Sequence, residues 1–140
     1  VRRSVLDRVG FFNEAFRHLD DRDMWLRCVY ITNAAYLSTP FHYYRFHSGG
    51  ISKKRIALQA EERLLIAEKI EELDISDLAK EYLAEFKSNN HYALGFEELK
   101  KSETQKRIAL KHFFSSFTLR PNMLSIKGAV KTFIGWREAK

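Results

Sequence analysis

Two patterns of apolar and polar positions follow one another along this chain and meet near residue 55. Beyond that point the sequence is rich in Ala, Leu, Glu and Lys, which favour helix. Apolar residues recur there every three or four positions, which predicts amphipathic helices joined by short turns and paired antiparallel. The first expected helix ends near Asp74, and the second runs from Leu78 to about Leu99. The third starts at a Ser102–Gln105 capping box, and the fourth starts at Pro121 and ends near Trp136. The expected buried positions are Ala57, Ala60, Leu64, Ala67 and Ile70, then Leu78, Tyr82 and Phe86, then Ala109, Phe113 and Phe117.

The first part of the chain predicts two helices of different length. Residues 2–9 suit a short helix that stops at Gly10. Asp20 is placed to cap a second helix over residues 21–32, with Asp23 as the acid of a capping box. That helix is expected to bury one face, which carries Trp25, Cys28, Val29 and Thr32.

Strand propensity is confined to the segment that follows. Residues 35–37 suit a short strand, and residues 41–46 form an aromatic run of the kind found in strands. Alternation would place Arg45 and His47 on one face of that second strand. The residues therefore predict a mainly α fold with a small β element, divided into regions 1–55 and 56–140.

Composition narrows the class of protein. A chain of 140 residues with 45% hydrophobic content is long enough for one folded domain. Its single cysteine, Cys28, forms no disulfide framework and is expected to be a small buried residue, so a reducing compartment is the simpler interpretation. No apolar run reaches the length of about 18 to 20 residues that a membrane span needs. We expect a cytoplasmic protein, or one at the inner face of the membrane.

Charge bears on the partners. Lys and Arg number 24 against 18 Asp and Glu, giving +6. These charges are interpreted as spread along the helices and mixed with acids, which argues against nucleic acid as a partner. A nucleotide diphosphate or an anionic membrane as the partner would equally account for the excess of positive charge. Lys127, Lys131, Trp136 and Arg137 suggest peripheral membrane contact through the last helix, although a solvated charged face is the commoner case.

Three short motifs carry the candidate chemistry. Residues 10–14 read G-F-F-N-E, residues 20–27 read D-D-R-D-M-W-L-R, and residues 44–47 read Y-R-F-H. This ordered set resembles the acceptor-side half of family 2 glycosyltransferases of the GT-A fold, whose motifs are G-G-F-D-E, E-D-x-D-L-W-x-R and Y-R-x-H. Phe11 replaces a glycine, Asn13 an aspartate and Asp20 a glutamate.

The resemblance has consequences for the organisation of the chain. It covers roughly residues 1 to 55, and the sequence opens with Val1 rather than Met in the middle of the pattern. We therefore expect a C-terminal fragment of an α/β GT-A glycosyltransferase. Residues 1–55 would be the acceptor-side end of the catalytic domain, and residues 56–140 a helical extension.

The resemblance implies that Asp21 is the catalytic base. An inverting transfer needs a carboxylate to take the proton from the acceptor hydroxyl, and a helix N-terminus favours a negative charge there. The alternative is that Asp20, Asp21 and Asp23 only serve the helix end, with Asp23 paired to Arg27. For an isolated D-D-x-D that alternative is the commoner case, but the ordered set of motifs favours the enzyme.

The same resemblance assigns roles to the neighbours of Asp21. Asp20 would bind the acceptor or orient Asp21, and Trp25 would stack on a sugar ring, although packing of Trp25 in a core is as good an interpretation. Arg27 would hold the preceding loop through Asp23 or a backbone carbonyl.

Arg45 and His47 are assigned to the donor side. Arg45 would bind phosphate oxygens, and His47 would complete the coordination of a divalent cation, Mg²⁺ or Mn²⁺, or contact the phosphates. A sheet-surface salt bridge for Arg45 and an exposed strand end for His47 remain open. The family's D-x-D, which holds the cation, would lie ahead of Val1, so no cofactor is expected in the fragment itself. His18, His42, His91 and His112 are assigned structural roles.

The function expected for the full-length parent is transfer of a sugar from a nucleotide-activated donor to the hydroxyl of a glycan or lipid-linked acceptor. The 140-residue fragment alone is expected to be inactive. A non-catalytic helical module for protein interaction is the competing interpretation, in which the acidic cluster only caps a helix.

Overall fold

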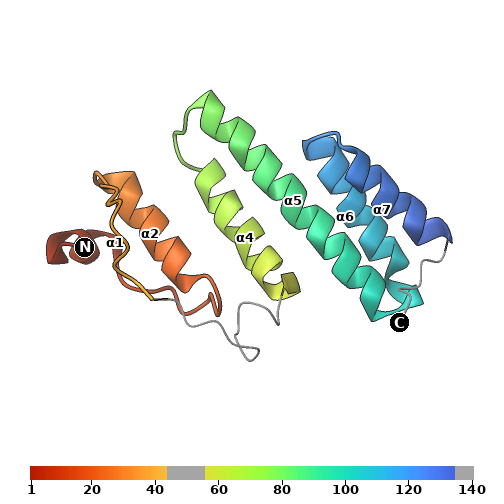
Figure 1. Ribbon diagram of the computed structural model, residues 1–140, viewed down its shortest axis with the longest axis horizontal. Coiled ribbons are helices and arrows are strands. Elements are labelled where there is room, and N and C mark those ends of the chain that lie inside the picture. The colour runs from red at the N-terminus through yellow and green to blue at the C-terminus, as the bar shows by residue number, and fades with distance from the viewer. Residues whose placement is uncertain (44–55, 135–140) are drawn as a thin grey trace. The chain divides into compact units, whose positions relative to one another are not determined.

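The computed structural model describes residues 1–43 and 56–134. Its contacts divide the chain into unit 1, Val1–Arg55, and unit 2, Ile56–Lys140. Every regular element of the described residues is helical, so the mainly α fold is confirmed. Unit 1 contains α1 (Arg3–Val9) and α2 (Asp20–Ile31). Unit 2 contains α4 (Ile56–Glu71), α5 (Asp77–Lys101), the 3₁₀-turn η1 (Glu103–Gln105), α6 (Lys106–Leu119) and α7 (Met123–Ile134) (Figure 1).

The strand expected at residues 35–37 is not formed. Residues 33–43 are irregular, and Tyr36 is 90% exposed. A strand is stable only when its N–H and C=O groups pair with a neighbour, and the described part of the chain supplies no partner strand. The prediction from local propensity was therefore wrong here. Most of the second expected strand, with Arg45 and His47, lies outside the described residues.

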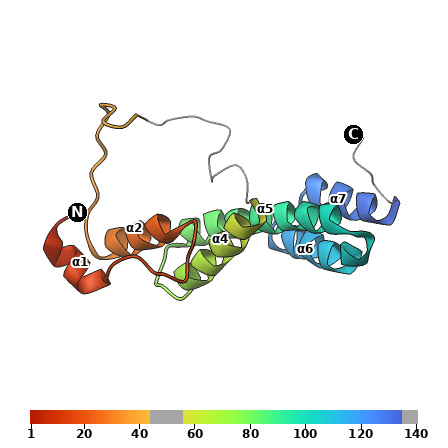
Figure 2. The same cartoon turned by 90° about the horizontal axis from the view of Figure 1, so that it is seen from below.

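Unit 2 is a set of helices built on α5. The longest helix, α5, contacts α4, α6 and α7, and α6 also contacts α7. Figure 2 shows α6 and α7 beside each other at the C-terminal half of α5. The short connections at residues 72–76 and 120–122 reverse the chain between neighbours, as expected for helices paired by short turns.

Two of the expected helix starts need correction. Ser102 does not cap α6: its Oγ lies 2.7 Å from Thr104 Oγ1, and Gln105 is the N-cap without a side-chain bond. Pro121 precedes α7 rather than entering its first turn. Asn122 is the residue that satisfies the helix end there, because its Oδ1 accepts the Ser125 N–H at 2.8 Å.

A phenylalanine between two glycines fixes how the helices of unit 2 fit together. The ring of Phe113 in α6 is 1% exposed. A Cβ added at Gly95 of α5 would lie 2.6 Å from this ring, and one at Gly128 of α7 would lie 2.4 Å from it. Both glycines are therefore needed for the close approach of α5 and α7 to Phe113.

Buried hydroxyl groups join the same three helices. Ser88 Oγ of α5 donates to the Ser116 carbonyl at 2.8 Å, and Ser116 Oγ of α6 lies 2.7 Å from Ser125 Oγ of α7. Ser125 Oγ in turn donates to Asn122 Oδ1 at 2.9 Å. Each buried hydroxyl thus has a partner, which removes the penalty of desolvating it.

The expected buried faces are right for some helices and wrong for α5. Ala60, Ala67, Ala109 and Phe113 are buried as expected, whereas Phe117 of α6 is 37% exposed. On α5, however, Leu78 and Tyr82 are 63% and 66% exposed, and Leu83 and Leu94 form the core instead. Helical spacing alone offers two neighbouring apolar stripes on α5, and the partner helices decide which one is covered.

Candidate functional site

The three aspartates at the start of α2 have different environments. Asp21 is exposed, Asp20 is half-buried, and Asp23 is buried at 3% exposure. Leu19 is the N-cap of α2 and makes no side-chain cap bond, so the expected Asp20 capping box is not formed. The helix begins at Asp20 itself, and Asp23 Oδ2 accepts a hydrogen bond from Arg27 Nε one turn further along α2. Asp21 Oδ1 accepts the N–H of Arg22 at 2.7 Å.

Asp23 and Arg27 form a structural ion pair. The Nε and Nη2 atoms of Arg27 each lie 3.0 Å from Asp23 Oδ2. The same guanidinium donates to the carbonyl of Val9 and, at 2.7 Å, to the carbonyl of Phe11. The expectation that Arg27 holds the preceding loop through Asp23 or a backbone carbonyl is confirmed, and it does both at once.

The loop that Arg27 holds depends on two further motif residues. Gly10 ends α1 at φ 79°, ψ −178°, a conformation that side chains with a Cβ strongly disfavour. Asn13 Oδ1 accepts the N–H of Ala15 at 3.1 Å, which makes a local turn that an aspartate would make equally well. The ring of Phe11, at the other substituted position, is 58% exposed and lies under the guanidinium of Arg3.

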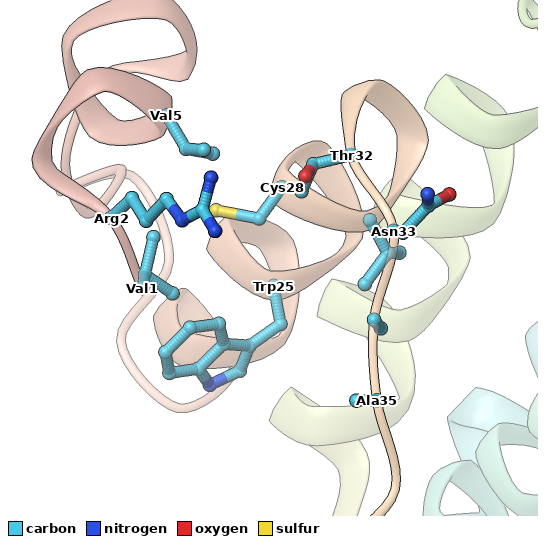
Figure 3. Close-up of a pocket in the computed structure, with 10 residues that line it drawn as sticks. Val1, Arg2, Val5, Trp25, Cys28, Thr32, Asn33 and Ala35 are labelled. Carbon is cyan, nitrogen blue, oxygen red and sulfur yellow. The ribbon is translucent and has the colours of Figure 1, made fainter.

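The face of α2 that was expected to be buried instead borders a pocket. Trp25 and Val29 are 47% and 48% exposed, and of the four expected residues only Cys28 is buried. A pocket of about 810 Å³ lies between this face, α1 and the segment after α2 (Figure 3). Its lining consists of Val1, Arg2, Val5, Trp25, Cys28, Val29, Thr32, Asn33, Ala34 and Ala35. The prediction of a packed face was wrong because no described element of unit 1 covers it.

Asp21 stands one turn before Trp25 on α2. Residues four apart lie on the same side of a helix, so the carboxylate of Asp21 is on the side that carries Trp25. Neither Asp20 nor Asp21 belongs to the pocket lining itself. The structure thus places Trp25 at the pocket and the exposed carboxylate of Asp21 one helical turn before it. Arg45 and His47 are outside the described residues, so their expected convergence on Asp21 is not tested.

Two histidines that the sequence had left unpaired meet in unit 2. His91 Nδ1 of α5 and His112 Nδ1 of α6 are 3.1 Å apart, so one ring donates to the other. Burial, and then the neighbouring His112 and Lys87, lower the pKa of His91 to about 4. Burial also lowers the pKa of His112, against the opposing influence of Glu98. Residues 21 positions apart meet only through the packing of α5 on α6, which spacing within one helix does not reveal.

Within residues 1–43 and 56–134, no three His, Cys, Asp or Glu side chains gather as a metal-binding group. Among the helices described, none combines the length and the apolar character that crossing a bilayer requires.

No family model, curated protein or solved structure matches this chain. An exposed carboxylate at the first turn of a helix can accept a proton, and the aromatic face one turn later offers a surface for a sugar ring or another apolar group.

Proposed function

We propose that this chain is the acceptor-side portion of a nucleotide-sugar-dependent glycosyltransferase of the family 2 type. The observation that carries the proposal is the separation of roles among the acids of α2. Asp23 is committed to Arg27, which ties α2 to the end of α1, whereas Asp21 is left exposed beside Trp25. Residues 10–14 and 20–27 thus form one local assembly, which gives a physical reason for those two motifs to occur together.

Asp21 acts as the general base in this proposal. Its carboxylate accepts the proton of the acceptor hydroxyl as the hydroxyl oxygen attacks the anomeric carbon of the donor sugar. The bond from that carbon to the diphosphate oxygen breaks, and the nucleoside diphosphate leaves with the electron pair. Two features support this role: Asp21 lies in the first turn of α2, where the helix dipole favours negative charge, and it is open to solvent.

The acceptor side is assigned to the neighbouring residues. Trp25 presents its ring at the pocket, where it stacks on an acceptor sugar. Asp20, half-buried next to Asp21, hydrogen-bonds the acceptor or orients the base. The acceptor is a glycan or a lipid-linked glycan.

The donor side relies partly on residues outside this chain. Arg45 would neutralise the leaving diphosphate, and His47 would contribute one ligand to a divalent cation, Mg²⁺ or Mn²⁺, whose other ligands would come from a D-x-D outside these 140 residues. The cation would stabilise the charge that develops on the leaving group. Residues 56–140 form a helical extension to this catalytic portion.

The competing function is a helical module for protein interaction. The exposed apolar side of α7, described below, favours it, because such surfaces commonly mark interaction sites. In that case the acids of α2 have no chemical role, and their removal leaves any transferase activity unchanged.

A matched pair of variants separates the two functions. Asp21→Asn and Asp77→Asn each remove one exposed carboxylate from the first turn of a helix. In the native polypeptide that contains this chain, nucleoside diphosphate release from a panel of nucleotide sugars with saccharide acceptors would be measured. The proposal predicts a loss of about 10²- to 10⁴-fold for Asp21→Asn and none for Asp77→Asn. Transfer that survives Asp21→Asn unchanged would contradict it.

A further inference from the structure

Helix α7 has the reverse of the usual polarity for a helix at a protein surface. Its buried residues are Ser125, Gly128 and Thr132, which are small or polar. Of its seven exposed residues six are apolar: Met123, Leu124, Ile126, Val130, Phe133 and Ile134. The seventh is Lys127. A surface helix normally turns its apolar stripe inward, so the outward stripe of α7 indicates that something else covers it.

The packing of unit 2 prevents α7 from rotating to hide this stripe. Gly128 is the position that lets α7 approach the Phe113 ring, where any Cβ would come within 2.4 Å. Ser125 bonds Ser116 at 2.7 Å on the same inner side. A rotation of α7 that turned Val130 or Ile134 inward would force a branched side chain into the space beside Phe113. The apolar side therefore faces outward because the inner side is already matched to its partners.

The charge around α7 is strongly one-sided. Residues 104–137 contain seven Lys or Arg and no Asp or Glu, whereas residues 1–103 hold 16 basic and 17 acidic residues. The +6 of the chain is thus concentrated around α6 and α7, and the interpretation of evenly mixed charge was wrong. The acid-free run was the sequence signal for it. On α7 itself, Lys127 and Lys131 follow one another along one flank of the outward stripe formed by Met123, Val130 and Ile134.

We propose that α7 docks on an anionic lipid surface with its outward apolar stripe inserted between the headgroups. Helices that lie in a membrane interface combine an apolar face with Lys or Arg beside it, and they insert only about 5 to 10 Å. Twelve residues of α7 span about 18 Å, enough to lie flat along the surface. Lys127, which is exposed, then contacts a lipid phosphate while Val130 and Ile134 enter the acyl boundary. Lys131 Nζ lies 5.5 Å from the centre of the Phe96 ring and adds positive charge beside the stripe. The proposal does not depend on the assigned glycosyltransferase chemistry.

Charge and apolar character together favour lipid over a second copy of this chain and over a nucleic acid. A second copy of this chain would bring its own acid-free segment against this one, and like charges would face each other with no carboxylate from residues 104–137 between them. A nucleic acid would match the charge but would leave the apolar stripe in water, because phosphate-backbone contacts are polar. An anionic bilayer satisfies both the charge and the stripe.

The test is co-sedimentation of the full chain with lipid vesicles. Vesicles of phosphatidylcholine alone would be compared with vesicles that contain about 30% phosphatidylglycerol, at low salt and at about 0.5 M salt. The variant Val130→Ser/Ile134→Ser removes two exposed apolar residues from α7. Its matched control, Leu78→Ser/Tyr82→Ser, removes two comparably exposed apolar residues from α5. Circular dichroism would verify that both variants remain helical.

The proposal predicts binding to the anionic vesicles that is at least about tenfold tighter than to neutral ones and that weakens with salt. Val130→Ser/Ile134→Ser should weaken it by about tenfold or more, and the α5 control should leave it unchanged. Equal binding by both variants, or no binding of the full chain to anionic vesicles, would overturn it. Two further results would also do so: a dimer in solution that Val130→Ser/Ile134→Ser dissociates, and binding to an oligonucleotide that is tighter than to vesicles.

Discussion

The guanidinium of Arg27 in α2 donates a hydrogen bond to the carbonyl of Val9 at the end of α1. A helix C-terminus leaves its last carbonyls without partners, so this bond stabilises the end of α1 as well as the position of the loop after it. The same side chain pairs with the buried Asp23. One residue therefore joins the two helices of unit 1.

Arg27→Met should destabilise unit 1 by roughly 1 to 3 kcal/mol, because it removes the ion pair of Arg27 with the buried Asp23 carboxylate and the hydrogen bonds to two backbone carbonyls. Urea unfolding followed by Trp25 fluorescence would measure the change, using a Trp136→Phe background so that the signal comes from unit 1 alone. Arg22→Met, at an exposed position of the same helix, is the control and should have little effect. Equal stability of the Arg27 and Arg22 variants would show that the guanidinium contacts contribute nothing.

Gly128→Ala should destabilise unit 2 by roughly 1 to 3 kcal/mol, because the added Cβ would meet the buried Phe113 ring. The sign of the effect is informative, since Gly→Ala at an open helical position stabilises by about 1 kcal/mol. Thermal unfolding followed by circular dichroism would measure it.

The double variant Gly128→Ala/Phe113→Leu supplies the control for that prediction. A smaller side chain at position 113 gives the new methyl group room, so the combined loss should be smaller than the sum of the two single losses. Additive losses, or a stabilising Gly128→Ala, would mean that Phe113 does not occupy the space beside Gly128.

The His91–His112 pair predicts that stability falls as the solution is acidified. The pKa of His91 is about 4 in the folded chain against 6.5 for an ordinary histidine, so the folded state binds fewer protons between these values. The contribution of the uncharged His91 to the free energy of unfolding is fully present above pH 6.5 and is lost as the pH falls toward 4. Part of the loss arises because two protonated rings cannot share the hydrogen bond between them.

Urea unfolding at about pH 7.5 and about pH 5 would measure this dependence. His91→Gln/His112→Gln should flatten it, whereas His42→Gln, at an exposed position, should not. An unchanged pH dependence in the double variant would place its origin elsewhere in the chain.

The described helices were largely predictable because their causes are local. Gly10 ends α1 where a glycine is required, and the spacing of Asp23 and Arg27 brings those two side chains together on one helix face. The features that were missed depend on neighbours from other parts of the chain. The strand expected at residues 35–37 has no partner strand within residues 1–43 and 56–134. The choice between apolar faces on α5 is made by adjacent helices, and His91 meets His112 only through helix packing.

The candidate site was predictable to a similar degree. The structural role of Arg27 followed from the motif. Asp21 is exposed, which the proposed role as a base requires, but that role itself stays a prediction. The pocket beside Trp25 was not foreseen, because helical spacing identifies an apolar face without showing whether anything packs on it.

The central claim is that Asp21 takes a proton from the acceptor. Its most direct test is chemical rescue of Asp21→Ala by added formate, measured as sugar transfer in the native polypeptide. A small carboxylate that diffuses into the space left by Asp21 can replace a missing base but cannot repair a helix end. We predict that Asp21→Ala loses about 10²- to 10⁴-fold in rate and regains activity as formate is raised, and that Asp77→Ala shows neither effect. Full activity of Asp21→Ala, or a loss that formate leaves untouched, would contradict the account.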